Sequence, residues 1–354
     1  MAWPGRAGST GTRGRPLTWH DIWLEALLLP AEVRHLQGPR QVRLGRDEAI
    51  VLCLVKDAGY HIGPFIAHYR KLGVGHIVLL DNGSTDDTLA QASGQVDVSV
   101  FQTRLPFRNN NRQMRRYLVR RFTARDRWAL VVDADELFDF PCSDRIGLPA
   151  MLAYLRSRGF TTMVSYLLDM LPDRPLSQVD AHLPMQQACP HYDLSAVRKR
   201  GYFEVDGYGG ERWVAHNRLA NPEVQRYVGG VRAQAFDLRE VYLIKHPLHL
   251  RDGRASLVHQ HFVDHAHVAD ISGVLCHYKF TPGFRARVDS AVRSGAYADG
   301  SWEYRRYQQA LDREPDMALC RATAQTLHSV NDLVANGFLQ VTDDYLDWVE
   351  KAST

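Results

Sequence analysis

The stretch WALVVDADELFDFP, residues 128–141, places three acidic side chains directly after an apolar run. Asp133 and Asp135 are two residues apart, and Glu136 follows them. On an extended chain, side chains two residues apart point to the same side, so the two aspartates can present their carboxylates together. Unpaired negative charge at the end of a buried strand is unfavourable, so a positive partner is expected there. Two carboxylates and a diphosphate are the oxygen ligands that a hard divalent cation such as Mg²⁺ prefers.

An isolated D-x-D pattern is common in solvated loops, so its weight depends on the elements around it. Apolar runs that predict strands alternate with amphipathic stretches that predict helices, which is typical of a mostly parallel α/β sheet. The helix after the second strand is expected to be capped by Ser84 or Thr85. The predicted strands are 49–55, 76–81, 96–103 and 128–132, and the predicted helices are 63–73, 84–93 and 109–126.

Acidic residues recur at or just past the ends of these predicted strands. They are Asp57, Asp81, Asp133 and Asp135. Because ligands of such sheets bind beyond the carboxyl ends of the strands, this recurrence indicates a site at that edge.

The second half of the chain is less regular. A strand is predicted at 161–170 and reaches its polar end at Asp169, and further strands are predicted at 239–250 and 273–280. The polar region between them, 171–230, is expected to form long loops over the active face. From about residue 282 onward the pattern is helical.

Composition excludes several classes of protein. The 354 residues include 43 basic and 40 acidic side chains, and this balance argues against a nucleic-acid-binding protein. The five cysteines are odd in number and form no C-x-x-C pair, which argues against disulfides and a thiolate zinc site and favours a reducing, cytoplasmic location. No run approaches the roughly 20 apolar residues of a membrane span. The Gly- and Arg-rich residues 1–20 predict a disordered tail, and with the segment 22–29 they are considered for peripheral contact at the inner face of the membrane.

Four stretches resemble the family 2-like glycosyltransferases of the GT-A fold. They are VKDAGYHIGPFIAHYRKLGVGHIVLLDNGSTDDT (55–88), WALVVDADELF (128–138), YVGGVRAQAF with LIKHPLHL (227–236 and 243–250), and VLCHYKF (274–280). Lys56-Asp57 departs from the Asn-Glu pair that is usual in that family. The resemblance implies an N-terminal extension (1–45), a GT-A domain with a Rossmann-like sheet flanked by helices (46–285), and a helical C-terminal region on or near the acceptor side (286–354).

The resemblance also implies a metal site for Mn²⁺ or Mg²⁺. Asp135 would bind the metal, Asp133 would contact the metal or the ribose, and His277 would complete the metal shell. A strand histidine is more often packed or hydrogen-bonded than a ligand, and His259 is the alternative third ligand.

Donor binding is assigned to residues at the same edge. The resemblance implies that Asp81 contacts the base or ribose, with Lys56 and Asp57 nearby, although the residues after Asp81 also read as an ordinary turn into a helix. Three cations are candidates for holding the diphosphate, because Arg supplies paired donors and Lys a point charge. They are Arg112, Arg232 and Lys245.

The segment HQHFVDHAH, residues 259–267, gathers four histidines and suggests zinc at first sight. His259 and His261 are expected to share a strand face. No H-E-x-x-H pattern or cysteine partner supports a dedicated zinc site, so His259 is expected to contribute to the same active site instead.

The expected activity is transfer of a sugar from a UDP- or GDP-linked donor to an acceptor hydroxyl, with inversion as the resemblance implies. A carboxylate must then take the proton of the acceptor, which is a saccharide, a lipid-linked saccharide or another hydroxyl compound. Asp169 and Asp193 are the catalytic candidates, and Glu204, Asp206 and Glu211 remain open alternatives.

Three other functions share parts of this pattern. A haloacid dehalogenase-like phosphatase would use Asp133 as nucleophile and Asp135 as acid, but that motif follows the first strand of its domain, and here at least three strands precede it. A nicotinamide-binding domain is excluded because no G-x-G-x-x-G turn follows the first strand. A catalytically inactive sugar- or nucleotide-binding protein of the same fold stays open because of Lys56-Asp57.

Overall fold

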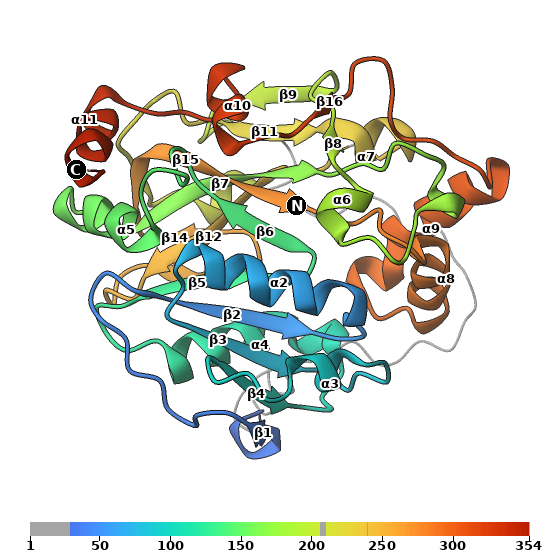
Figure 1. Cartoon of the computed structure of the whole chain (residues 1–354), viewed down its shortest axis with the longest axis horizontal. Coiled ribbons are helices and arrows are strands. Elements are labelled where there is room, and N and C mark those ends of the chain that lie inside the picture. Colours follow the sequence, from blue (N-terminus) through green and yellow to red (C-terminus); the bar gives the residue numbers. More distant parts are fainter. Residues whose placement is uncertain (1–28, 206–209, 239, 354) are drawn as a thin grey trace.

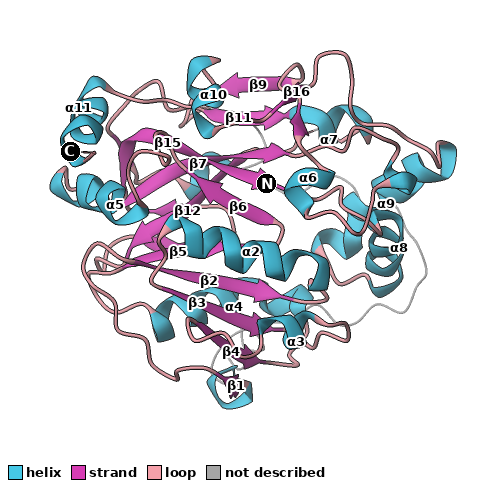
Figure 2. Cartoon of the chain, in the orientation of Figure 1, coloured by secondary structure: helices cyan, strands magenta, loops and turns pink. Residues whose placement is uncertain are grey.

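The computed structural model describes residues 29–205, 210–238 and 240–353 of the chain (Figure 1). The tail 1–20, most of the segment 22–29 and Asp206 lie outside these residues. A ten-stranded sheet forms the centre, in the order β1-β4-β3-β2-β5-β12-β7-β15-β10, with β6 added to β15. Helices flank this mixed, mostly parallel sheet, so the predicted α/β fold class is confirmed (Figure 2).

The first half follows the predicted alternation of strands and helices. Strands β2, β3, β4 and β5 pair in parallel, and fully buried aliphatic residues explain why the sequence pattern found them. The elements are β2 (Ala49–Val55), α2 (Gly59–Leu72), β3 (His76–Asp81), α3 (Thr88–Ala92), β4 (Val98–Gln102), α4 (Phe107–Phe122) and β5 (Trp128–Val132).

Two hydrophobic layers cover the two faces of this half-sheet. Alternate residues of β2 take opposite sides, so Val51 and Cys53 belong to the layer under α2, whereas Ile50 and Leu52 belong to the layer under α4. Figure 2 shows α2 in front of the sheet and α4 behind it. The sheet therefore separates the hydrophobic layer under α2 from the layer under α4.

The second half adds the long strands β7 (Thr162–Asp169) and β15 (His267–His277), which pair in parallel. Between β5 and β7 lies β12 (Ile244–Leu250), which runs antiparallel to both. Because of this reversed direction, the first residues of β12 lie at the edge where β5 and β7 end. Strand β6 (Glu136–Asp139) follows the acidic motif directly and pairs antiparallel with β15.

Shorter elements complete the chain. The region 171–230, predicted as long loops, contains small strands and helices that cover one end of the sheet. The remaining elements are β1 (Arg34–Gln37), α5 (Leu148–Ser157), η1 (Leu176–Gln178), α6 (Met185–Ala188), β8 (His191–Tyr192), β9 (Val197–Arg200), η2 (Gly210–Trp213), β10 (Arg218–Leu219), β11 (Arg226–Gly229), α7 (Gly230–Ala235), β13 (Ser256–Leu257), β14 (Val263–Asp264), α8 (Phe284–Ser294), α9 (Ala298–Arg313), β16 (Gln325–Thr326), α10 (Val330–Ala335) and α11 (Asp343–Ala352).

Some local predictions were wrong. Helix α3 begins at Thr88 after Asp87, not after Ser84 or Thr85, because Ser84 instead accepts a hydrogen bond from the backbone N–H of Asp57. His259 lies between β13 and β14, not on a strand.

All five cysteines are free thiols. No helix within the described residues is long and apolar enough to cross a membrane.

Candidate active site

Charged side chains gather at the edge where β5, β7 and β15 end and β12 begins. In Figure 1 the arrowheads of β2, β7 and β15 point to one side of the sheet, and α8 and α9 lie on that side. The residues that the structure brings together there are Arg115, Asp133, Asp135, Glu136, Asp169, Arg232, Lys245, His277 and Glu303.

Asp133 is held by two cations. The guanidinium of Arg115, on α4, donates to Oδ1 of Asp133, and Nζ of Lys245 lies 3.2 Å from Oδ2. Lys245 also lies 2.6 Å from Oε2 of Glu136, and Glu136 accepts the backbone N–H of Asp133 at 2.9 Å. The lysine predicted to hold a diphosphate is thus engaged by two carboxylates, with only 1% of its side chain exposed.

The protonation states follow from this packing. Burial would raise the pKa of Asp133, but Arg115 and Lys245 outweigh it and hold that pKa at about 2. Burial would lower the pKa of Lys245, and the two carboxylates raise it instead. Burial raises the pKa of Glu136, against the attraction of Lys245. Asp133 therefore carries its charge at neutral pH, in a fixed orientation.

A second chain of contacts starts at Asp135. Its Oδ2 lies 3.5 Å from Nε2 of His277, and Nδ1 of the same imidazole lies 2.7 Å from Oδ1 of Asp169. Arg232 Nε donates to Oδ2 of Asp169 at 2.9 Å, and its Nη1 lies 3.5 Å from Glu303. The imidazole is thus oriented by Asp169, as a carboxylate commonly orients a metal-binding histidine.

The charges along this chain reinforce one another. Burial would lower the pKa of His277, but the carboxylates of Asp135 and Asp169 raise it to about 9. Burial would raise the pKa of Asp169, but Arg232 and His277 hold it at about 2. Burial would also raise the pKa of Asp135, but the charge of His277 outweighs it and holds that pKa well below its usual range. Both aspartates are therefore anionic at neutral pH.

Sequence reasoning missed two of these residues. Arg115 lies one helical turn from the predicted Arg112, and only the structure shows which arginine of α4 faces the sheet. Glu303 comes from α9, more than 160 residues after the acidic motif, and its Oε1 accepts the hydroxyl of Tyr307. No local pattern around Glu303 distinguishes it from a surface glutamate of an amphipathic helix.

Two buried N–H groups at this edge have no hydrogen-bond partner. They are Nη1 of Arg115 and Nη2 of Arg232. Buried guanidinium groups normally satisfy their donors, so an unused pair of this kind has the chemistry of an anion-binding site. Beside these donors the two aspartates keep solvent access, with 33% of the Asp133 side chain and 31% of the Asp135 side chain exposed.

The donor set around Asp135 fits a divalent cation. Two anionic carboxylates and one imidazole nitrogen are ligands that Mn²⁺ accepts, and the carboxylates alone suit Mg²⁺. Nε2 of His277 and Oδ2 of Asp135 face each other there, so a metal bound between them would replace the imidazole proton. Asp133 is already oriented by Arg115 and Lys245.

Other predicted donor residues lie elsewhere along the edge. Asp81 is fully buried, and its carboxylate accepts hydrogen bonds from Gly83, Ser84 and Gln102. Asp57 has a positive φ of 48° and accepts the backbone N–H of Thr85 at 2.7 Å. Both aspartates thus stabilise the turn after β3. The side chains of Lys56 and Arg112 are exposed.

The remaining carboxylate candidates are not in contact with this cluster. Asp193 accepts hydrogen bonds from Ser195 at 2.8 Å and Thr323 at 2.6 Å and is almost fully buried. Glu204 forms an ion pair with Arg200, and Glu211 lies in η2. Asp206 lies outside the described residues.

His259 lies close to the cationic side of the site. Its ring stacks on Trp213 at 4.3 Å between centroids and an interplanar angle of 9°. Burial, and then the positive charges of Arg112 and Arg115, lower its pKa to about 4. His259, the alternative to His277 as third metal ligand, is therefore a neutral imidazole near the arginines, whereas His277 contacts Asp135 itself.

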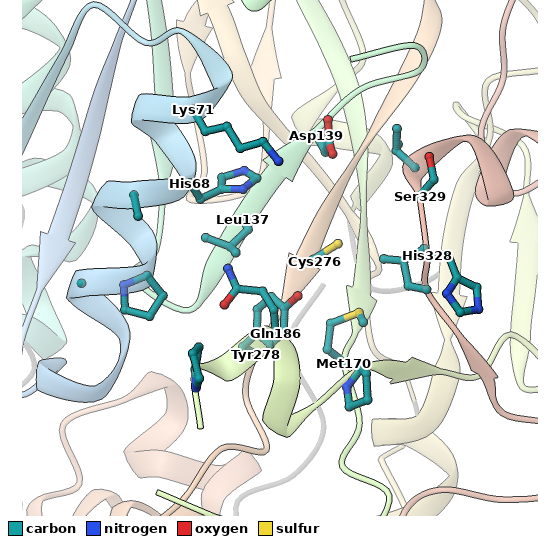
Figure 3. Close-up of a pocket in the computed structure, with 17 residues that line it drawn as sticks. His68, Lys71, Leu137, Asp139, Met170, Gln186, Cys276, Tyr278, His328 and Ser329 are labelled. Atoms are coloured by element: carbon teal, nitrogen blue, oxygen red, sulfur yellow. The ribbon is translucent and has the colours of Figure 1, made fainter. Parts of the chain in front are cut away.

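A separate cavity of about 660 Å³ lies on the α2 side of the sheet (Figure 3). His68 and Lys71 of α2 and Asp139 of β6 line it together with Cys276. Cys276 pairs with Leu137, whereas His277 pairs with Glu136, so the cavity and the acidic cluster take opposite faces of β6 and β15. This cavity is thus not part of the charged edge.

Comparisons with known proteins identify no family. No family model matches the chain, and no curated protein matches it. One solved structure with a partial likeness is a crystal structure of glucosyl-3-phosphoglycerate synthase from Mycobacterium tuberculosis in complex with Mn²⁺, UDP and glucosyl-3-phosphoglycerate. The match has 17% identity and a TM-score of 0.23, and it covers 44% of this chain and 50% of that chain. At this TM-score the likeness carries no argument about this chain.

Proposed function

We propose that this chain is a metal-dependent glycosyltransferase that moves a sugar from a nucleoside-diphosphate donor to an acceptor hydroxyl. The observation that carries the proposal is that anionic carboxylates and unpaired cationic N–H groups lie at the same edge of the sheet. Asp133 and Asp135 expose anionic carboxylates, and beside them Arg115 and Arg232 hold buried N–H groups without partners. A divalent cation would bind the carboxylates and a diphosphate would accept from the N–H groups, so the two together would satisfy both sets of side chains.

Within this proposal each residue has a distinct task. Asp135 and His277 would hold the metal, with Asp133 kept beside them by Arg115 and Lys245. Bound Mn²⁺ or Mg²⁺ would supply neutralisation of charge on the leaving diphosphate. The unpaired donors of Arg115 and Arg232 are buried, so binding diphosphate oxygens would require these two side chains to turn outward. Lys56, Asp57 and Arg112 would line the nucleotide end of the site.

The proton of the acceptor needs a carboxylate that is exposed and near the metal. Asp169 accepts from both His277 and Arg232 and keeps a pKa of about 2, so it orients the imidazole and is poorly suited to take a proton. We assign the general base to Glu303, whose side chain is 38% exposed. Burial would raise its pKa, but Lys279 and Arg232 outweigh that effect and keep it anionic. A single displacement with this base would invert the sugar carbon.

The phosphatase alternative requires Asp133 as a nucleophile. Both of its oxygens accept from cations, Arg115 on one and Lys245 on the other, which reduces their nucleophilicity. The transferase proposal is therefore preferred. The donor base, UDP or GDP, and the acceptor class, whether saccharide, lipid-linked saccharide or another hydroxyl compound, are left to experiment.

The proposal is tested by following nucleotide release from a panel of UDP- and GDP-sugars in the presence of Mn²⁺, with water or added saccharides as acceptor. The same protein is assayed with p-nitrophenyl phosphate. Release of UDP or GDP that stops when Mn²⁺ is chelated supports the transferase. Phosphate release from p-nitrophenyl phosphate without sugar transfer would instead establish the phosphatase.

A further inference from the structure

Three side chains outside the acidic cluster form a second group with metal-ligand chemistry. The ligand atoms of His216, Asp264 and His265 all lie within 4.8 Å of one another. Nδ1 of His216 is 2.8 Å from Oδ2 of Asp264, and Nε2 of His265 is 3.9 Å from the same oxygen. One carboxylate oxygen thus faces two imidazole nitrogens.

The fold brings these residues together from two segments. His216 follows η2, whereas Asp264 ends β14 and His265 comes next. His265 adopts a positive φ of 59°, which turns its ring back over that of His216. The two rings lie 4.4 Å apart and within 10° of parallel. Asp264 is buried, and its other oxygen accepts the backbone N–H of His216 at 2.9 Å, so the carboxylate is held toward the imidazoles.

We propose that His216, Asp264 and His265 bind a Zn²⁺ ion. Two imidazole nitrogens and one carboxylate oxygen are a donor set that suits zinc, with a fourth position left for water. Magnesium and calcium prefer sites made of oxygen ligands alone, so this group would discriminate against them. Metal–ligand bonds of about 2.0–2.2 Å would require only a small approach of His265 and replacement of the His216 hydrogen bond by a bond to zinc.

The site is open and separate from the acidic cluster. The side chain of His216 is 62% exposed and that of His265 is 56% exposed, so an ion can enter from solvent. His267 and His277 are the first and last residues of β15, and ten residue steps of a strand span about 33 Å. In Figure 1, β14 lies on the opposite side of the sheet from α8 and α9.

Zinc at this position would link two segments that also reach the cationic side of the active edge. Trp213, in η2, precedes His216 by three residues and stacks on His259. His259 lies in the connection between β13 and β14, five residues before Asp264. Bridging His216 to Asp264 and His265 would fix both ends of this contact, so the ion has a structural role. This inference does not depend on the proposed transferase activity.

From the sequence alone, no dedicated zinc site is expected in HQHFVDHAH, because no H-E-x-x-H pattern or cysteine partner accompanies its histidines. HQHFVDHAH lacks a complete ligand set, because the third ligand comes from His216, about 50 positions earlier. His259 and His261 are not part of the group, and His267 instead contacts the carbonyl of Gly159 at 3.0 Å.

The test is a calorimetric titration of Zn²⁺ into metal-free full-length protein carrying Asp135→Asn, so that the acidic cluster does not contribute. We expect one Zn²⁺ per chain in this parent and a rise in its melting temperature. Adding His216→Asn or His265→Asn should abolish both effects. Adding His267→Asn is the matched control, because this histidine lies two residues beyond His265, and it should leave both unchanged.

Excess Mg²⁺ should not displace the zinc, since it does not favour imidazole ligands. No stoichiometric Zn²⁺ in the parent would overturn the proposal. So would equal Zn²⁺ binding with and without His265→Asn, or loss of binding in His267→Asn alone. If His216→Asn fails to fold, His265→Asn decides the matter, because its imidazole is exposed and makes no hydrogen bond needed by β14.

Discussion

The ammonium of Lys245 lies 2.6 Å from the carboxylate of Glu136 and 3.2 Å from that of Asp133, with almost no access to solvent. Lys245 is the second residue of the antiparallel strand β12, and Glu136 is the first residue of β6. Their contact fixes the backbone on both sides of Ala134 and Asp135. The orientation of the acidic motif is therefore built into the sheet before any ligand is present.

Replacing Lys245 with Met should destabilise the fold strongly. Removing one partner of a buried ion pair leaves uncompensated charge, at a cost of about 3–5 kcal/mol. Urea unfolding followed by circular dichroism measures this loss. The double variant Lys245→Met/Glu136→Gln should recover part of it, because one of the two stranded charges is then neutral.

Lys56→Met is the control for that experiment. Lys56 is exposed, and exposed substitutions usually change stability by no more than about 0.5 kcal/mol. Equal destabilisation by Lys56→Met and Lys245→Met would show that the buried ion pair does not have the assigned importance.

Glu303→Gln should lower kcat by about 10²–10⁴-fold if this carboxylate is the general base. Its amide can still accept the hydroxyl of Tyr307, so donor binding and folding should be retained. Nucleotide release from the active donor sugar measures the rate, and calorimetry measures donor affinity.

Glu314→Gln is the matched control for Glu303, because Glu314 is an exposed glutamate just after α9. It should be fully active. A Glu303→Gln protein with undiminished kcat would remove Glu303 from the mechanism and return attention to Asp169.

Stability should fall in acid because several histidines are buried in neutral form. Burial lowers the pKa of His249 to about 4, and its Nδ1 has no hydrogen-bond partner. The unfolded chain binds the proton near pH 6.5, so stability is present above that pH and is lost as pH falls toward 4. The loss is about 3 kcal/mol for this one residue.

His249→Leu should remove the proton that His249 takes up when the protein unfolds in acid. The slope of unfolding free energy against pH between 6.5 and 4 should then decrease by about 1.4 kcal/mol per pH unit relative to the wild type. Chemical unfolding at a series of pH values gives both slopes. Identical slopes would mean that His249 is already protonated, or not buried, in the folded protein.

Gly229→Ala should disturb the turn that leads into α7 and Arg232. Gly229 has a φ of 93°, and an added Cβ would lie 2.6 Å from the carbonyl oxygen of Ala196. Gly94→Ala is matched for positive φ, at 73°, but its Cβ would meet nothing within 4 Å. A side chain in the left-handed region costs about 1–2 kcal/mol, and the backbone of Gly229, with ψ of −115°, lies outside that region. Only Gly229→Ala should lose more than this in thermal unfolding and also weaken diphosphate binding.

Much of the sheet could be predicted because its strands are short and buried on both faces. Ala49–Val55 and Trp128–Val132 are continuously apolar over the length of a strand that is buried on both faces. The same runs locate the carboxyl edge and hence the positions of Asp133 and Asp135. The structure agrees on these elements because local sequence and tertiary burial demand the same conformation.

Partners that come from distant segments could not be predicted. The choice of Arg115 over Arg112 depends on how α4 rotates against the sheet, and the engagement of Lys245 depends on the antiparallel direction of β12. Glu303 reaches the site only because α9 packs beside it. Each of these follows from tertiary packing, about which a local pattern carries no information.

The most direct test of the account is calorimetric titration of UDP and GDP, with and without Mn²⁺, into wild type, Asp135→Asn and the control Asp139→Asn. Asp139 lies four residues on, in β6, and faces the cavity on the other side of the sheet. The account predicts Mn²⁺-dependent binding of one nucleotide by wild type and Asp139→Asn, and its loss in Asp135→Asn with an unchanged melting temperature. Binding that is independent of Mn²⁺, or that survives in Asp135→Asn, would contradict it.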